Sequence, residues 1–189
     1  MRVISGKYKG KNLEGFDING TRPTMDRVKE SLFGSIQNKV INSVCLDLFA
    51  GSGSLGIEAL SNGGSKCYFV DNNYEIIKKL EKNLKGIDNS TLLKKSYEEA
   101  LKYFKDSEIK FDLIFLDPPY KLNLINKAID KIEEYHLLND DAMIICEYET
   151  EKIDRTELEL LKEKNMVVNI LKYMKNSIYF FVEKLFLFL

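Results

Sequence analysis

The residues with the clearest chemical potential are Asp117, Pro118, Pro119 and Tyr120, which directly follow the apolar run 111–116. An apolar run of this length that stops at prolines predicts a buried strand, because proline cannot donate the next ladder hydrogen bond. The strand would end in a carboxylate, unpaired carbonyl oxygens and an aromatic ring. Together these groups suit a flat molecule that bears an amine, such as a nucleobase. An ordinary strand-to-helix turn is the alternative interpretation of the four residues.

A second buried-strand run, residues 44–49, leads into the glycine-rich turn 50–56 and then into a helical pattern. Strand, glycine-rich turn and helix form the nucleotide-binding start of an open α/β sheet. Gly51 and Gly53 would let the backbone approach a ligand closely, beside the free N–H groups of the helix N-terminus. Asp71 ends the next expected strand, 20 residues after Gly51, and could hold a ribose diol. These features alone suit NAD as well as S-adenosylmethionine.

Asp47 favours S-adenosylmethionine over NAD. It lies inside the strand, four residues before Gly51, where a carboxylate would repel the pyrophosphate of NAD. S-adenosylmethionine has no phosphate and carries an ammonium and a sulfonium, which an acidic strand end attracts. The alternative for Asp47 is a structural role, as a helix cap or in an ion pair.

The segment 47–53, Asp71 and the block 117–120 stand in the order of the motifs of class I amino-methyltransferases, which the chain resembles. Two N-terminal segments, 2–11 and 21–33, narrow the resemblance to the RsmD family of bacterial 16S rRNA guanine-N2 methyltransferases. The resemblance spans essentially the whole chain. It implies S-adenosylmethionine as the cofactor and a guanine N2 amine of 16S rRNA as the acceptor, within an assembling small-subunit particle.

The resemblance also implies roles for individual residues. Hydrogen bonds from the guanine amine to Asp117 and to the Pro118 carbonyl would localise the amine's lone pair, and Tyr120 would stack on or border the base. Ser96 and Tyr97 correspond to the place where the family holds the adenine. The full set of expected cofactor-binding residues is Asp47, Phe49, Gly51, Ser52, Gly53, Asp71, Asn72, Ser96, Tyr97 and Thr24.

Other functions remain open from the residues. Adenine-N6 transfer is the close alternative, because the same acceptor pocket suits any exocyclic amine. A nicotinamide-dependent oxidoreductase is allowed by the glycines and Asp71, but it leaves the block 117–120 unexplained. A non-catalytic RNA-binding module is a third interpretation, against which the presence of both Asp47 and the block 117–120 argues.

The positive charge is concentrated at the start of the chain. The net charge is −1, yet residues 1–11 contain four cations and no acid. Such a segment can follow a phosphate backbone, so we expect RNA contacts from Arg2, Lys7, Lys9, Lys11 and, in the Arg-Pro-Thr block, Arg22. A lysine-rich edge hairpin that only keeps the protein in solution is the alternative, and Arg22 could instead reach the cofactor.

The composition, with 44% hydrophobic and 30% charged residues, is typical of a soluble protein. The length predicts one methyltransferase domain over residues 1–189, with residues 1–20 as a basic arm. The three cysteines fall in expected buried strands and the only histidine, His136, late in a helix, so we expect no metal and a reducing, cytoplasmic setting. A basic, strand-like start indicates no signal peptide, and the apolar run 178–189 is too short to span a bilayer. We expect a monomer without a membrane partner.

The elements that must position these residues follow from the apolar pattern. Thr24 is the expected N-cap of an amphipathic helix over 25–38. Strands and helices then alternate, which predicts βαβ units and a parallel sheet: strands 44–49, 66–70, 91–95, 111–116 and 142–147, and helices 54–62, 73–85, 97–105 and 122–135. A helix near 154–164 and strands near 166–174 and 178–186 look like the end of a class I methyltransferase sheet. The expected fold is Rossmann-like α/β, with a seven-stranded mostly parallel sheet, one antiparallel strand, and an N-terminal β-hairpin and helix.

Overall fold

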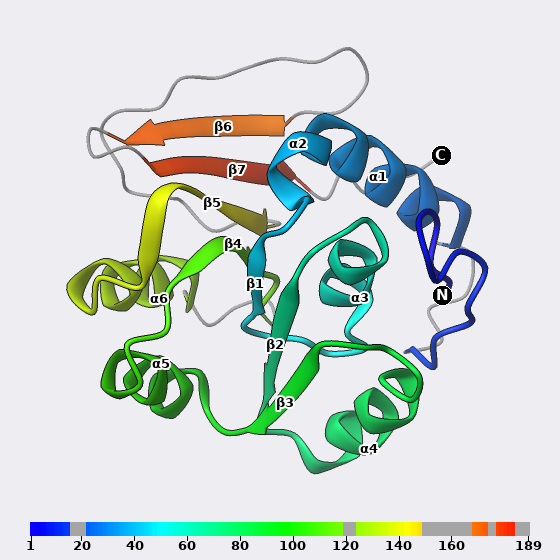
Figure 1. Cartoon of the computed structure of the whole chain (residues 1–189), viewed down its shortest axis with the longest axis horizontal. Coiled ribbons are helices and arrows are strands. Elements are labelled where there is room, and N and C mark those ends of the chain that lie inside the picture. Colours follow the sequence, from blue (N-terminus) through cyan, green and yellow to red (C-terminus); the bar gives the residue numbers. More distant parts are fainter. Residues whose placement is uncertain (16–21, 119–123, 149–167, 174–176, 184–189) are drawn as a thin grey trace.

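The computed structural model describes residues 1–15, 22–118, 124–148, 168–173 and 177–183. Side chains are described for 1–15, 26–118 and 124–146. Figure 1 shows a central twisted sheet with helices on both sides. Within the described part of the chain, no helix is long and apolar enough to cross a bilayer.

The sheet has the strand order β3-β2-β1-β4-β5-β7-β6. Neighbouring strands are parallel from β3 through β5 to β7, and β6 is antiparallel to β7. The chain therefore moves outward from β1 in one direction to β2 and β3, and then returns to place β4 on the other side of β1. The strands are β1 (Val44–Asp47), β2 (Lys66–Asp71), β3 (Ser90–Lys94), β4 (Phe111–Leu116), β5 (Leu138–Tyr148), β6 (Val168–Tyr173) and β7 (Ser177–Glu183).

Two layers of helices bury the two faces of the sheet. Alternate residues of each strand point to opposite faces, so that Phe69 packs in one core and Tyr68 and Val70 in the other. The first core contains side chains of α1 to α4 and of the N-terminal segment, and the second contains side chains of α5 and α6. The helices are α1 (Arg22–Ser35), α2 (Gln37–Val40), α3 (Ser54–Ser61), α4 (Tyr74–Asn83), α5 (Tyr97–Asp106) and α6 (Leu124–Glu134).

The doubly wound arrangement agrees with the alternation of patterns in the sequence, and β4 has the predicted bounds. The first helix differs from its prediction. α1 begins at Arg22, so Thr24 lies inside the helix and is not its N-cap. Proline is favoured in the first turn of a helix, and Pro23 provides this at the observed start. The helix predicted near 154–164 lies outside the described residues.

The expected N-terminal β-hairpin is present only as a short pairing within the described residues 1–15. One antiparallel bridge joins Arg2 and Asn12, with backbone hydrogen bonds from Val3 N–H to the Lys11 carbonyl and from Leu13 N–H to the Met1 carbonyl. The pairing does not extend into a ladder, because the backbone N–H groups of Ile4 and Ser5 donate to the Glu58 carboxylate of α3. The segment therefore lies against the helices as a closed loop, in blue in Figure 1.

Candidate active site

The candidate site lies where the direction of the strand order reverses, between β1 and β4. The carboxyl ends of parallel strands on either side of such a point form the ligand crevice of open α/β sheets. The two strands are in register, with Asp47 opposite Phe115, and Leu48 N–H donates to the Phe115 carbonyl at 3.1 Å. Continuing this register by two residues brings Phe49 and Asp117 to the same level. The two motifs that are far apart in the sequence thus meet at one edge.

The glycine-rich turn after β1 makes a tight connection to α3. Gly53 has a φ of 76° and is the N-cap of α3, with no side-chain cap. A Cβ on Gly53 would come within 2.6 Å of Leu80 Cδ1, so both the backbone conformation and the packing on α4 require glycine there. Gly51 and Ser52 are half-buried in the same turn. A helix start leaves backbone N–H groups without helical partners, and here Gly53 N–H donates to the Ala50 carbonyl and Gly56 N–H to Asp47.

Asp47 is buried, with 2% of its surface exposed, and its Oδ2 accepts a hydrogen bond from Gly56 N–H at 3.0 Å. This contact ties α3 to the end of β1, which is the structural alternative that the sequence left open. Burial raises the pKa of Asp47 to about 7, with a further rise from the charge of Asp71 and an opposing effect of the Gly56 hydrogen bond. A cation beside this carboxyl group would favour its ionised form.

Asp71 holds the turn from the other side. Its Oδ2 accepts from Gly51 N–H at 3.1 Å, and its Oδ1 accepts from Asn73 N–H at 2.9 Å. Asn73 in turn caps α4 by accepting from the backbone N–H groups of Glu75 and Ile76. Asn72, between them, is exposed. The expected contact of Asp71 with a ribose remains a prediction, and the capping role of Asn73 was missed although asparagine before a helix is its usual signal.

An aromatic pair borders the other side of the site. The rings of Phe49, after β1, and Tyr97, in the first turn of α5, lie 5.6 Å apart at 44°. Burial, followed by Glu98, raises the pKa of Tyr97 to about 12. Ser96 is the N-cap of α5 in a full capping box with Glu99, so its hydroxyl is already engaged. The contact of Ser96 and Tyr97 with an adenine remains a prediction.

The predicted acceptor pocket is only partly described. Asp117 is half-buried and Pro118 is buried directly after β4. Pro119 and Tyr120 lie outside the described residues. The same holds for the side chains of Arg22 and Thr24, which are placed on α1 by their backbone alone.

The N-terminal segment reaches the glycine-rich turn, which the sequence did not indicate. Met1 Sδ lies 3.6 Å from the Ser52 hydroxyl. A shallow surface depression lies beside this contact, and its lining residues come from the segment, the turn and α4: Glu14, Gly15, Gly51, Ser52, Ile76 and Lys79.

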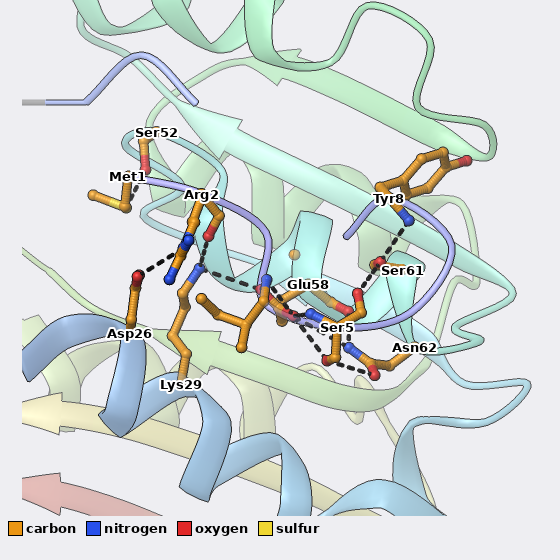
Figure 2. A network of polar contacts seen from close by, with 12 residues as sticks. Met1, Arg2, Ser5, Tyr8, Asp26, Lys29, Ser52, Glu58, Ser61 and Asn62 are labelled. Atoms are coloured by element: carbon orange, nitrogen blue, oxygen red, sulfur yellow. Dashed lines mark hydrogen bonds and ion pairs between the residues drawn. The ribbon is translucent and has the colours of Figure 1, made fainter. Parts of the chain in front are cut away.

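A buried ion pair anchors the N-terminal segment (Figure 2). Lys29 of α1 and Glu58 of α3 are 6% and 0% exposed, and Lys29 Nζ lies 3.2 Å from Glu58 Oε2. Lys29 Nζ also donates to the Arg2 carbonyl at 2.6 Å, and Glu58 accepts from Ile4 and Ser5. Buried charges require such partners. A lysine and a glutamate on helices without a shared motif carry no sequence signal for this role.

Most of the cations predicted to bind RNA already have partners. Arg2 pairs with Asp26 at 3.0 Å. Lys7 pairs with Asp88 at 2.7 Å, and this hydrogen bond is the main cause of the raised pKa of Lys7. Lys11 Nζ donates to a backbone carbonyl at 2.8 Å. Lys9 is exposed and its ammonium has no hydrogen bond or ion pair to another described residue. The segment is thus a docked surface and not a free arm.

Metal-ligating residue types and cysteines are distributed as follows in the described residues. These residues contain no group of three or more histidine, cysteine, aspartate or glutamate side chains that could hold a metal ion. The cysteines are buried free thiols, and burial raises the pKa of Cys45 to about 12.

The comparisons with known proteins agree with this geometry. The family model described as conserved hypothetical protein 95 matches residues 1–175. A protein of Haemophilus influenzae named ribosomal RNA small subunit methyltransferase D is 38% identical over 170 residues, which are 87% of this chain and 88% of that protein. The protein of the same name from Escherichia coli K12 is 33% identical over 153 residues, or 80% and 76% of the two chains.

Two solved structures are similar in sequence and in fold. The yhhF protein of Escherichia coli has a TM-score of 0.71 and 31% identity, covering 87% of this chain and 90% of its own. The HI0767 protein of Haemophilus influenzae has a TM-score of 0.66 and 35% identity, covering 87% and 91%.

Proposed function

The chain belongs to the RsmD family, whose model is described as conserved hypothetical protein 95, and from this premise we propose that it is an S-adenosylmethionine-dependent rRNA methyltransferase. The acceptor is the exocyclic N2 amine of a guanine in the 16S rRNA of the small ribosomal subunit. The observation that carries the proposal is the meeting of the glycine-rich turn after β1 with Asp117 after β4 at the reversal point of the strand order.

The residues at this edge fit S-adenosylmethionine. The two carboxyl groups at the ends of β1 and β2, Asp47 and Asp71, favour a cationic ligand over a pyrophosphate. Gly51, Ser52 and Gly53 provide a backbone surface that a ligand can approach, and Phe49 and Tyr97 provide an apolar wall. When bound, the cofactor supplies a methyl group on a sulfonium that is already activated for displacement.

The chain's own residues contribute position and electrostatics. The guanine amine is a poor nucleophile because its lone pair is delocalised into the ring. Hydrogen bonds from this amine to the Asp117 carboxylate and the Pro118 carbonyl would turn the lone pair toward the methyl group. Pro119 and Tyr120 would border the base. Asp117 would also be placed to receive the proton that the amine loses.

Adenine-N6 transfer is the second candidate, because Asp117 and the neighbouring carbonyl can accept from any exocyclic amine. One experiment separates the two. The protein is incubated with labelled S-adenosylmethionine and small-subunit particles that lack the modification, and the rRNA is digested to nucleosides for mass spectrometry. We expect N2-methylguanosine. Label in N6-methyladenosine, or no label in rRNA, would overturn the assignment.

The RNA surface that we propose includes Arg2, Lys7, Lys9, Lys11 and Arg22. The concentration of positive charge in residues 1–11 supports it, and exposed Lys9 is the best placed of these groups. An rRNA substrate is made and assembled in the cytoplasm, where we place the reaction. We further propose that the protein acts on an assembly particle, and adding free 16S rRNA as a second substrate to the transfer experiment tests this. We also propose that the protein acts as a monomer.

A further inference from the structure

The side chain of Asn83, the last residue of α4, joins two segments that are distant in sequence. It is only 3% exposed. Its Nδ2 donates to the Ser52 carbonyl and to the Glu14 carbonyl, both at 2.9 Å. Its Oδ1 accepts from Glu14 N–H at 2.8 Å. Both amide donors and the amide acceptor are thus engaged in one place.

Ser52 lies between Gly51 and Gly53 in the turn that the cofactor must approach. Glycines leave this turn with few side-chain contacts of its own, so its conformation depends on outside partners. The Asp71 carboxylate accepts a hydrogen bond from Gly51 N–H, and the Asn83 amide donates one to the carbonyl of the next residue, Ser52. Glu14 and Gly15 line the same surface depression as Gly51 and Ser52 of the turn.

We propose that Asn83 is a positioning residue for the cofactor. It ties the glycine-rich turn to Glu14, so that residues 1–15 form one wall of the cofactor site and the docking of this segment is energetically coupled to cofactor binding. The inference rests on the proposed function, because it assumes that the turn binds S-adenosylmethionine. Coupling is reciprocal, so the cofactor should also order the segment.

The test uses the product S-adenosylhomocysteine as the probe and the full chain. Asn83→Ala removes all three hydrogen bonds, and Asn83→Asp keeps the shape but turns a carboxylate toward two carbonyl oxygens. The matched control is Asn62→Ala. Asn62 also ties the segment to a helix, through the Ser5 hydroxyl at 2.9 Å, but its described contacts do not include the glycine-rich turn.

Titration calorimetry should show the Kd of the probe raised about tenfold in both Asn83 variants, as for loss of a buried hydrogen-bond partner. In the transfer assay the cofactor KM should rise with it, while kcat at saturating cofactor stays within about twofold. Asn62→Ala should leave Kd unchanged. An unchanged Kd in a folded Asn83 variant, or an equal rise in Asn62→Ala, would overturn the coupling.

A second measurement needs no variant, so it remains decisive if the Asn83 variants do not fold. Hydrogen exchange of the wild-type protein is compared with and without S-adenosylhomocysteine. We expect slower exchange at Glu14 N–H as well as in residues 51–56. Slower exchange in residues 51–56 without any change at Glu14 would overturn the coupling inference but not the proposed function. A wild-type protein that does not bind the probe at all would instead refute the proposed function.

Discussion

At the scale of single residues, the two acids of the site have different surroundings and therefore different roles. Asp47 is buried and bonded to Gly56 N–H, while Asp117 is half-buried at the edge where the acceptor would lie. Removing each charge should thus affect a different step. Asp47 should act on cofactor binding and Asp117 on the transfer itself.

Asp117→Ala should abolish most turnover and leave cofactor affinity nearly intact. The carboxylate would contact the acceptor amine, so its loss should lower kcat by ~10²–10³-fold, as for loss of one transition-state hydrogen bond. Single-turnover methyl transfer and calorimetry with S-adenosylhomocysteine measure the two quantities. Asp106→Ala, at the exposed end of α5, is the control. Activity within threefold of wild type, an about 0.65 kcal/mol effect, would show that Asp117 only ends a strand.

The raised pKa of Asp47 predicts a pH dependence. The folded-state pKa of about 7 lies above the ordinary value of 3.8, so the unliganded fold binds an extra proton between these values and loses stability as the pH rises from 4 to 7. A cationic cofactor favours the carboxylate, so its affinity should increase as the pH rises through about 7. Asn can still accept from Gly56 N–H, so Asp47→Asn should fold and should lack both dependences.

Calorimetry of S-adenosylmethionine binding across this pH range, with urea unfolding in parallel, checks the prediction. A wild-type affinity that does not change with pH would place the cofactor's positive charges away from Asp47. Asp47→Ala would be a poorer test than Asp47→Asn, because it also removes the hydrogen bond from Gly56 N–H of α3.

At the scale of elements, the N-terminal segment is attached to α1 and α3 by the Lys29–Glu58 pair. Leaving one member of a buried pair without its partner is costly, so Lys29→Met and Glu58→Gln should each lower the free energy of unfolding by ~3 kcal/mol. The exposed pair of Lys78 and Glu75 is the matched control, and Lys78→Met should cost less than ~1 kcal/mol. Urea unfolding measures both. Equal small effects would mean that the pair does not hold the segment.

Gly6 provides a second test of the same attachment. Its φ is 75°, and a Cβ would overlap the Ser61 carbonyl of α3. Gly6→Ala should therefore displace the loop, whereas Gly10→Ala has open space around its Cβ and strains only its left-handed backbone. Hydrogen exchange at Lys7 N–H, which donates to the Ser61 carbonyl, should speed up in the first variant and much less in the second. If Lys7 N–H exchanged at a similar rate in both variants, the effect of Gly6→Ala would come from its backbone conformation alone and not from the contact with Ser61.

At the scale of the whole molecule, the positive charge predicted to bind RNA belongs to the docked segment 1–15 and not to a free arm. Because Lys7 and Lys11 have partners and Lys9 has none within the described residues, Lys9→Gln should weaken RNA binding most among single changes. Neutralising Lys7, Lys9 and Lys11 together should make the plot of log K against log salt less steep. The slope should change by roughly 0.7–0.9 for each phosphate contact that is lost. Filter binding over a salt series measures this, with Lys102→Gln on α5 as the control. An unchanged slope would place the RNA surface elsewhere.

The sequence by itself determined the order of elements and the identity of the two motifs. Strong apolar periodicity placed β4 at its bounds and α5 within one residue, because buried strands and amphipathic helices impose local patterns. Glycines and prolines marked the two strand ends, because their backbone chemistry restricts what can follow.

Only the tertiary structure decided which groups these motifs meet. Asp47 was expected to face the cofactor, and its bond to Gly56 appears only when α3 folds back on β1. Residues 1–20 were expected as a β-hairpin arm, but within residues 1–15 the pairing stops after one bridge, because Glu58 accepts from the N–H groups of Ile4 and Ser5 and no local pattern reveals this. Asn83 joins Ser52 to Glu14 for the same reason. A side chain's hydrogen-bond partner depends on where distant segments cross, and that is a property of the packed molecule.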